Sequence, residues 1–162
     1  MPVSLSIWRM RGLVQRVQGA SVTVAGEVAG EVVGAIGPGL CVLVGVTHTD
    51  TVTEARKLAE KVWHLRVMDD EAGVMNRSVA DTTREVLVVS QFTLYGDCRK
   101  GNRPSFNQAG KPEFASEMCD RFCVLLGAEL GRPVPTGRFG AHMMVHLVND
   151  GPVTLMLERE AG

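Results

Sequence analysis

The sequence predicts a single compact α+β domain with a mostly antiparallel, barrel-like sheet and two main helices. Its 162 residues suit one domain, and 45% hydrophobic with 22% charged residues is the balance of an ordinary globular protein. Valine-rich runs separated by glycine-containing turns are typical of sheets. Two segments, residues 51–65 and 112–126, repeat apolar residues at helical spacing. Together these observations predict the fold class.

The N-terminal part of the chain is expected to form strands. Gly37-Pro38-Gly39 is a strong break, and the apolar run that follows it, residues 40–46, has the length of a strand buried on both faces. Before the break, a meander with a turn at Gly26 is expected over residues 13–17, 20–25 and 28–36.

Each predicted helix has a recognisable start. Thr51 and Glu54 have the spacing of a capping box, and Pro112 suits the first turn of the second helix. The apolar stripe of the first helix consists of Val52, Ala55, Leu58, Ala59, Val62 and Leu65. That of the second consists of Phe114, Ala115, Met118, Cys119, Phe122, Leu125 and Leu126.

Residues 85–94 predict a central strand that begins as pure core and becomes partly polar towards its end. On a strand, Gln91 and Thr93 would share one face, while Phe92 and Leu94 would share the other. Polar side chains at the end of a buried strand need partners or a ligand. Either the strand emerges into solvent there, or these groups surround a bound substrate.

The remaining segments are expected to be a long surface loop over residues 95–111 and two or three strands over residues 134–157. The last strands are interrupted at residues 149–152 (NDGP). An ordinary turn explains this interruption, because Asn, Asp and Gly form turns readily and proline cannot donate to a sheet.

Composition limits the possible ligands. The net charge of -1 and a pI near 6.4 argue against a broad basic surface for nucleic acid, so an RNA ligand would need a local patch. Arg99, Lys100 and Arg103 supply one candidate patch for phosphate, although a solvated loop explains them equally well. His142 and His146 lie on a strand-like segment, and we expect neither a metal site nor a cofactor.

The cysteines and the apolar runs bear on the compartment. None of the four cysteines belongs to a CxxC pair, which suits a reducing environment. No apolar run reaches the length of a membrane span, and the first nine residues do not resemble a signal peptide. We therefore expect a cytoplasmic protein that does not contact membranes.

Two longer segments carry a family resemblance. SQFTLYGDCRKGNRPSF at residues 90–106 and NDGPVTL at residues 149–155 are similar to the signature segments of the D-aminoacyl-tRNA deacylases. MRGLVQRV at residues 10–17 resembles the usual start of that family, and ASVTV, GEVVG, IGPGL and TGRFGA recur in the expected order. Residues 1–9 have no counterpart and are expected to be an extension or a cloning remnant, ahead of a single domain over residues 10–162.

The resemblance implies a homodimer whose active sites are shared between subunits. The strand of one subunit would supply the catalytic residues Ser90, Gln91, Phe92 and Thr93, and a cis Gly151-Pro152 element would reach in from the other. The acceptor end of an aminoacylated tRNA would contact further substrate-binding residues, namely Asn149, Phe139, Arg99, Lys100 and Arg103.

The expected reaction is hydrolysis of the ester of D-aminoacyl-tRNA, and of mischarged glycyl-tRNA, with rejection of L-aminoacyl-tRNA. Main-chain N–H groups near Gln91 and Phe92 would stabilise the oxyanion. Thr93 could act as nucleophile, or the terminal ribose hydroxyl of the tRNA could activate water; with no base visible near Thr93 in the sequence, we favour the second route. Two alternatives remain: a non-catalytic protein that binds aminoacylated RNA ends, and an esterase with Thr93 as nucleophile.

Overall fold

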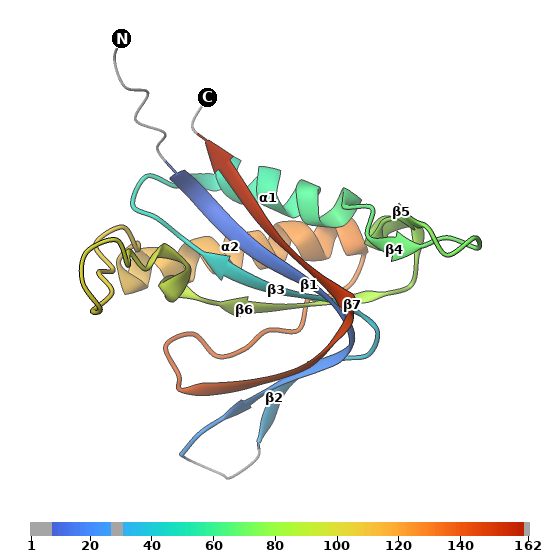
Figure 1. Cartoon of the computed structure of the whole chain (residues 1–162), viewed down its shortest axis with the longest axis horizontal. Coiled ribbons are helices and arrows are strands. Elements are labelled where there is room, and N and C mark those ends of the chain that lie inside the picture. The colour runs from blue at the N-terminus through green and yellow to red at the C-terminus, as the bar shows by residue number, and fades with distance from the viewer. Residues whose placement is uncertain (1–7, 27–30, 161–162) are drawn as a thin grey trace.

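A single long strand, β1 (Trp8–Val24), organises the sheet of the computed structural model, which describes residues 8–26 and 31–160. Along one edge β1 pairs antiparallel with β7 (Met143–Glu160). Its other edge pairs first with β3 (Gly39–Gly45) and then with β2 (Val32–Ile36), both antiparallel. Because β1 changes partner along its length, the sheet curls (Figure 1).

The curl makes the sheet barrel-like, as the sequence predicted. The fourth strand, β6 (Glu85–Ser90), runs parallel to β3 and completes the order β2-β1-β3-β6, with β7 on β1. Beyond β6, Thr136 forms a parallel bridge with Val88. A Cβ added to Gly34 of β2 would lie 2.3 Å from the carbonyl oxygen of Thr136. Residues around Thr136 therefore bring the two ends of the curled sheet together, and glycine at position 34 permits that approach.

Both faces of the central strands are buried, which explains the continuous apolar run of β3. Alternate residues of β3 and β6 point towards the helices and into the curl. The helix side contains Leu40, Val42, Val44, Val86 and Val88 in a cluster with the helices. The smaller cluster inside the curl consists of Val17, Ala20, Val22, Ile36, Cys41, Leu87 and Val89.

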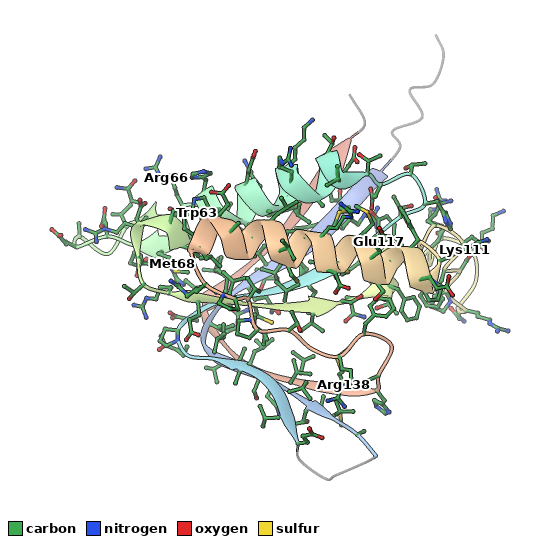
Figure 2. All side chains as sticks on the ribbon, turned by 180° about the vertical axis from the view of Figure 1, so that it is seen from behind. Trp63, Arg66, Met68, Lys111, Glu117 and Arg138 are labelled. Carbon is green, nitrogen blue, oxygen red and sulfur yellow. The ribbon has the colours of Figure 1, made fainter. Side chains whose placement is uncertain are left out.

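Two helices cover one face of the sheet and pack against each other (Figures 1 and 2). Thr51 caps α1 (Val52–His64) in the predicted capping box with Glu54. The second helix, α2 (Pro112–Leu130), has proline in its first turn and ends at Gly131, whose φ of 74° is left-handed. Of the predicted stripe of α1, Val52 is exposed, since it lies at the first position of the helix.

The expected strand over residues 85–94 is too long. The strand β6 ends at Ser90, and a short 3-10 helix, η2 (Phe92–Tyr95), follows. Its neighbour β3 ends at Gly45, so Gln91 makes the last bond to that strand through the carbonyl of Val44. The alternation expected for residues 91–94 therefore does not apply.

The expected interruptions within β1 and β7 were also wrong. Residues 13–17 and 20–25 are not separate strands, because β1 runs through with irregular register around Val17. Similarly, residues 149–152 are no turn between strands, since β7 continues through them as a bulge. Both misreadings arose because glycine and polar residues mark bulges as well as turns.

The remaining elements lie at the edge of the domain. The strands β4 (Met68–Asp69) and β5 (Met75–Arg77) form a small hairpin, followed by the 3-10 helix η1 (Val79–Asp81). In the turn between β4 and β5, Asp70 accepts hydrogen bonds from the N–H groups of Ala72 and Val74.

Some expectations fall on residues that the structure does not describe. Residues 1–7 of the expected extension, and residues 28–30 of the expected third strand, lie outside the described part of the chain. The expected domain start at Met10 falls within β1, whose backbone is described from Trp8. Among the helices of the described part, none combines the length and the apolarity needed to cross a membrane.

Candidate functional site

The end of β6 places Ser90 and Gln91 in different surroundings. Ser90 continues the face of β6 that carries Val86 and Val88, so its hydroxyl points to the helices and hydrogen-bonds with the thiol of Cys119 on α2. The N–H of Gln91 donates to the carbonyl of Val44 at 2.7 Å. Because this N–H already has a partner, Gln91 cannot be one of the expected oxyanion donors through its main chain.

The first residues of η2 carry backbone N–H groups for which no backbone acceptor is recorded in the described part of the chain. The N–H groups of Phe92 and Thr93 begin this 3-10 helix, where no preceding turn offers an acceptor. The amide of Gln91 donates from Nε2 to the hydroxyl of Thr93. Thr93 therefore has an amide partner in place of a titratable base.

Arg11 of β1, which sequence reasoning missed, holds η2 in place. Its Nη1 donates to the carbonyl of Leu94 at 2.6 Å, and its guanidinium lies 4.5 Å from the centre of the Tyr95 ring. Its Nε lies 3.1 Å from a carboxylate oxygen of Glu158 on β7. An arginine within an apolar strand was the signal in the sequence that pointed to such a role.

The loop after η2 carries the three candidate phosphate contacts. Asp97 binds the guanidinium of Arg99 through both carboxylate oxygens, at 2.9 and 2.8 Å. These hydrogen bonds lower the pKa of Asp97 to about 2. The charge of Arg99 is thus largely compensated, whereas Lys100 and Arg103 are exposed and neither forms an ion pair recorded within the described part of the chain.

Phe139 lies in a turn shortly after the segment that is bridged to β6. Thr136 and Val88 form an isolated parallel bridge, and the N–H of Gly137 donates to the carbonyl of Val88 at 3.2 Å. The ring of Phe139 is 40% exposed, and Arg138 beside it lies 3.9 Å from Glu31 in an ion pair. Figure 2 shows Arg138 on the side of the sheet opposite to α2. The structure thus brings the segment that leads to Phe139 to the edge of β6, while residues 90–93 and the loop follow from the end of the same strand.

The second signature segment forms a bulge in β7. Val17 pairs with Asn149 and Gln15 with Thr154, so four residues of β7 stand opposite Arg16 alone. The peptide bond between Gly151 and Pro152 is cis, the geometry that the resemblance implied. Gly151 has a φ of 132° and lies against Arg16, so a side chain there would be strained and crowded.

Arg16 and Gln18 hold this bulge from β1, and the sequence analysis assigned neither of them. Arg16 donates from Nε to the carbonyl of Asp150 at 3.1 Å and from Nη1 to the carbonyl of Val67 at 2.8 Å. Gln18 donates to the carboxylate of Asp150 at 2.9 Å. The side chain of Asn149 binds within the bulge, accepting from Val153 N–H and donating to Thr154. Asn149 therefore shapes the bulge.

Within one chain, the bulge and the end of β6 lie far apart. The pairing aligns Arg16 with Leu40 and Val86, and Gly12 with Val44 and Ser90. Arg16 and Gly12 are four residues apart, which is about 13 Å along a strand. From β7 to β6 there are three strand spacings, which is about 14 Å across the sheet. Figure 1 shows the bend of β7 near the β4–β5 hairpin, away from the loop that follows η2.

A cavity of about 420 Å³ adjoins the bulge rather than the end of β6. Its charged lining includes Arg16, Asp69, Arg77, Arg84 and Asp150. Among the described residues, no group of three or more His, Cys, Asp or Glu side chains is arranged to hold a metal ion. At η2 the polar groups are backbone N–H groups, the amide of Gln91 and the hydroxyl of Thr93.

The family model for D-Tyr-tRNA(Tyr) deacylase matches residues 13–158. The D-aminoacyl-tRNA deacylase of Heliobacterium modesticaldum is 56% identical over 153 residues, which cover 94% of this chain and 99% of the relative. That of Parabacteroides distasonis is 50% identical and covers 93% and 98%. A solved structure named c-Myc DNA Unwinding Element Binding Protein superposes with a TM-score of 0.84 at 44% identity, covering 93% of this chain and 99% of that one. The chain therefore belongs to the D-Tyr-tRNA(Tyr) deacylase family, which confirms the resemblance of its signature segments and its assignment to the D-aminoacyl-tRNA deacylase enzymes.

Proposed function

We propose that two copies of this chain form a dimer that hydrolyses the ester of D-aminoacyl-tRNA, with each active site shared between the copies. The separation of the two signature segments carries this proposal. Because Gly151-Pro152 lies far from η2 within one chain, a site that uses both segments needs a second copy. Cleavage of mischarged glycyl-tRNA, and residues 10–162 as the functional domain, belong to the same proposal.

The edge of the sheet supports a dimer. Within the described strands, β7 pairs with β1 alone and leaves its other edge open over 18 residues. Open edges readily pair or pack with another chain, and exposed apolar side chains mark such contacts. On β7 the exposed apolar residues are Met144, Val145, Val148, Leu155 and Met156. A second copy that covered this strand would also cover the bulge.

The chiral selection would come from the backbone of the bulge. A rigid wall beside the α-carbon of the substrate leaves room for hydrogen on that side only. A D-residue would point its side chain away from the wall, whereas an L-residue would drive its side chain into it. Glycine has no side chain and would pass. The hydrogen bond from Arg16 to the carbonyl of Asp150 supports this role, since it would hold the wall next to Gly151 in place.

For the chemistry, the N–H groups of Phe92 and Thr93 would stabilise the oxyanion of the tetrahedral intermediate. The aminoacyl ester is already activated, so this modest assistance suffices. The hydroxyl of Thr93 faces an amide, which favours the route in which the terminal ribose hydroxyl of the tRNA activates the water. Lys100 and Arg103 would contact phosphate, Phe139 would contact the terminal adenosine, and the enzyme would work in the cytoplasm.

A time course of deacylation with matched D-Tyr-tRNA and L-Tyr-tRNA tests the activity and its selectivity. Rapid release from the D-ester alone is expected. If a well-folded dimer cleaves neither ester, the catalytic proposal fails, and a protein that binds aminoacylated RNA ends without cleaving them becomes the first alternative. If it cleaves simple esters equally well without tRNA, it is an ordinary esterase.

Mixing two defective variants tests the shared site. Gly151→Ala disturbs the bulge but leaves η2 intact. Phe92→Pro removes one oxyanion N–H at a helix start that tolerates proline, while Phe92→Ala keeps that N–H as a control. After exchange of subunits, each mixed dimer would contain one intact site, so activity would return to about a quarter of the wild-type value. Activity that stays at the level of the separate variants would rule out sharing.

A further inference from the structure

Exposed aromatic rings gather at the end of the sheet where β6 stops. Phe92 is 55% exposed, Phe106 38% and Phe139 40%. The other two phenylalanines of the chain, Phe114 and Phe122, pack in or against the helix-side core. In a protein with so few aromatic residues, two exposed rings in contact with each other indicate a binding surface.

The backbone fixes the position of Phe106. Asp97 and Ser105 exchange two hydrogen bonds, of 2.7 and 2.9 Å, which close the loop between them. The ring of Phe106 then meets the ring of Phe92 with the centres 5.2 Å apart and the planes at 70°. A Cβ added to Gly96 would lie 3.2 Å from the Phe106 ring, so glycine lets the ring approach. Phe106 is therefore held in a defined place.

The edge-to-face arrangement leaves part of the aromatic surface open. When two rings meet edge to face, their contact covers at most one face of one ring, and Phe92 and Phe106 remain 55% and 38% exposed. The closed loop that precedes Phe106 carries the exposed cations Lys100 and Arg103. Open aromatic faces next to positive charge are what single-stranded nucleic acids bind, with bases on the rings and phosphates on the cations.

We propose that Phe106 is a base-stacking residue that holds one of the last two bases of the single-stranded 3′ end of tRNA. This assignment rests on the proposed function, since that function brings the ester-bearing end of tRNA to η2. The Phe106 ring contacts the ring of Phe92, the residue whose N–H would face the ester in the proposed function. Phe106 thereby positions the substrate and takes no part in the bond cleavage itself.

The test uses an uncharged acceptor-stem minihelix with 2-aminopurine at the last or the next-to-last nucleotide. Fluorescence of 2-aminopurine falls when the base stacks on an aromatic ring. With the wild-type protein, quenching is expected at one of the two positions. Phe106→Leu should abolish that quenching and weaken binding about tenfold, within the range of one lost base–aromatic stack. Phe106→Tyr should restore both, and Val124→Ala, exposed on α2, should change neither.

The same variants, in turnover of D-Tyr-tRNA, separate this proposal from the proposed function. Phe106→Leu should raise KM about tenfold and leave kcat within about twofold, because stacking serves binding. Equal KM values for the wild type and Phe106→Leu overturn the stacking role while deacylation stands. Quenching that depends on Phe106 in a protein that cleaves no ester upholds stacking and overturns the deacylase. The stacking role is also overturned if the minihelix binds without quenching at either position, or if it does not bind. A protein partner would then be the candidate for this surface.

Discussion

The guanidinium of Arg16 donates to the carbonyl oxygen of Asp150 at 3.1 Å and thereby ties the middle of β1 to the bulge of β7. The same side chain reaches the carbonyl of Val67 and lies 3.2 Å from the carboxylate of Asp69. It is only 12% exposed, so these bonds are partly shielded from water. One side chain therefore connects three separate segments behind Gly151.

Replacing the guanidinium of Arg16 should reduce the selectivity for D-aminoacyl esters over L-aminoacyl esters. Arg16→Lys keeps the charge but loses the planar arrangement of donors, so the bulge gains freedom. We expect the ratio of D-Tyr-tRNA to L-Tyr-tRNA cleavage to fall about tenfold or more, as for loss of a buried charge-assisted hydrogen bond. Single-turnover rates with both esters measure it. Arg121→Lys on α2 is the matched control, and an unchanged ratio in Arg16→Lys would show that the bulge needs no such support.

Thr93→Ala should remain an active enzyme. The hydroxyl of Thr93 meets the amide of Gln91, which cannot remove its proton. We expect kcat for D-Tyr-tRNA to fall by less than about tenfold, whereas removal of a true nucleophile costs several orders of magnitude. A trapped acyl-enzyme on Thr93, or a loss of about a thousandfold, contradicts the RNA-assisted route.

The three cations of the loop should differ in their contribution to RNA binding. Lys100→Gln and Arg103→Gln should each raise KM and reduce the slope of log KM against log salt by about 0.7, the value for one phosphate contact on a single strand. Arg99→Gln should change the slope less, because Asp97 compensates its charge. The comparison is made by titrating salt in steady-state assays. Three equal changes would mean that the Asp97–Arg99 pair opens when RNA binds.

Gly39→Ala should destabilise the fold. A Cβ at this position would lie 1.9 Å from the carbonyl oxygen of Glu85, where β3 and β6 begin side by side, so backbone must move. We expect a loss of about 3 kcal/mol in the free energy of unfolding, the upper part of the range for overpacking. Urea unfolding measures it. Gly19→Ala is the matched control, since its nearest neighbour would lie at 3.5 Å, and equal midpoints for the two variants would refute the steric argument.

Thiol chemistry should separate one cysteine from the other three. Burial raises the pKa of Cys41 and Cys119 to about 11 and that of Cys123 to about 12, so these thiols stay protonated at neutral pH. Cys98 lies exposed in the loop. Iodoacetamide at pH 7 followed by mass spectrometry should find modification at Cys98 alone, and labelling of the others should appear only at strongly alkaline pH. Rapid labelling of Cys119 at pH 7 would show that α2 opens from Ser90.

The sequence predicted the elements that local chemistry determines. The capping box at Thr51, the proline at the start of α2 and the buried run of β3 all depend on near neighbours or on simple periodicity. They were confirmed because each pattern fits one local structure well. The predicted length of β6 was wrong, because that length depends on where β3 ends. No pattern within residues 85–94 indicates the end of β3.

The sequence indicated candidate site residues but not how the fold arranges them. The signature segments indicated residues 90–93 and 149–152, yet periodicity placed the first on a strand and the second in a turn. Arg11 and Arg16, which hold these segments, act across the sheet from 83 and 134 residues away. Such long-range partners require the pairing of β1 with both β3 and β7, and that pairing is a property of the whole sheet.

The dual pairing of β1 also limits how this protein can change its length. One inserted residue within β1 would turn every later side chain of β1 to the opposite face of the sheet. It would also shift the pairing of β1 with the strands on both of its edges, β2 and β3 on one side and β7 on the other. The alignment of Arg16 with the bulge would be lost in the same step. Insertions and deletions among descendants of this chain should therefore fall in peripheral connections such as the β4–β5 hairpin, and an affinity tag or a reporter domain is best inserted at the same place.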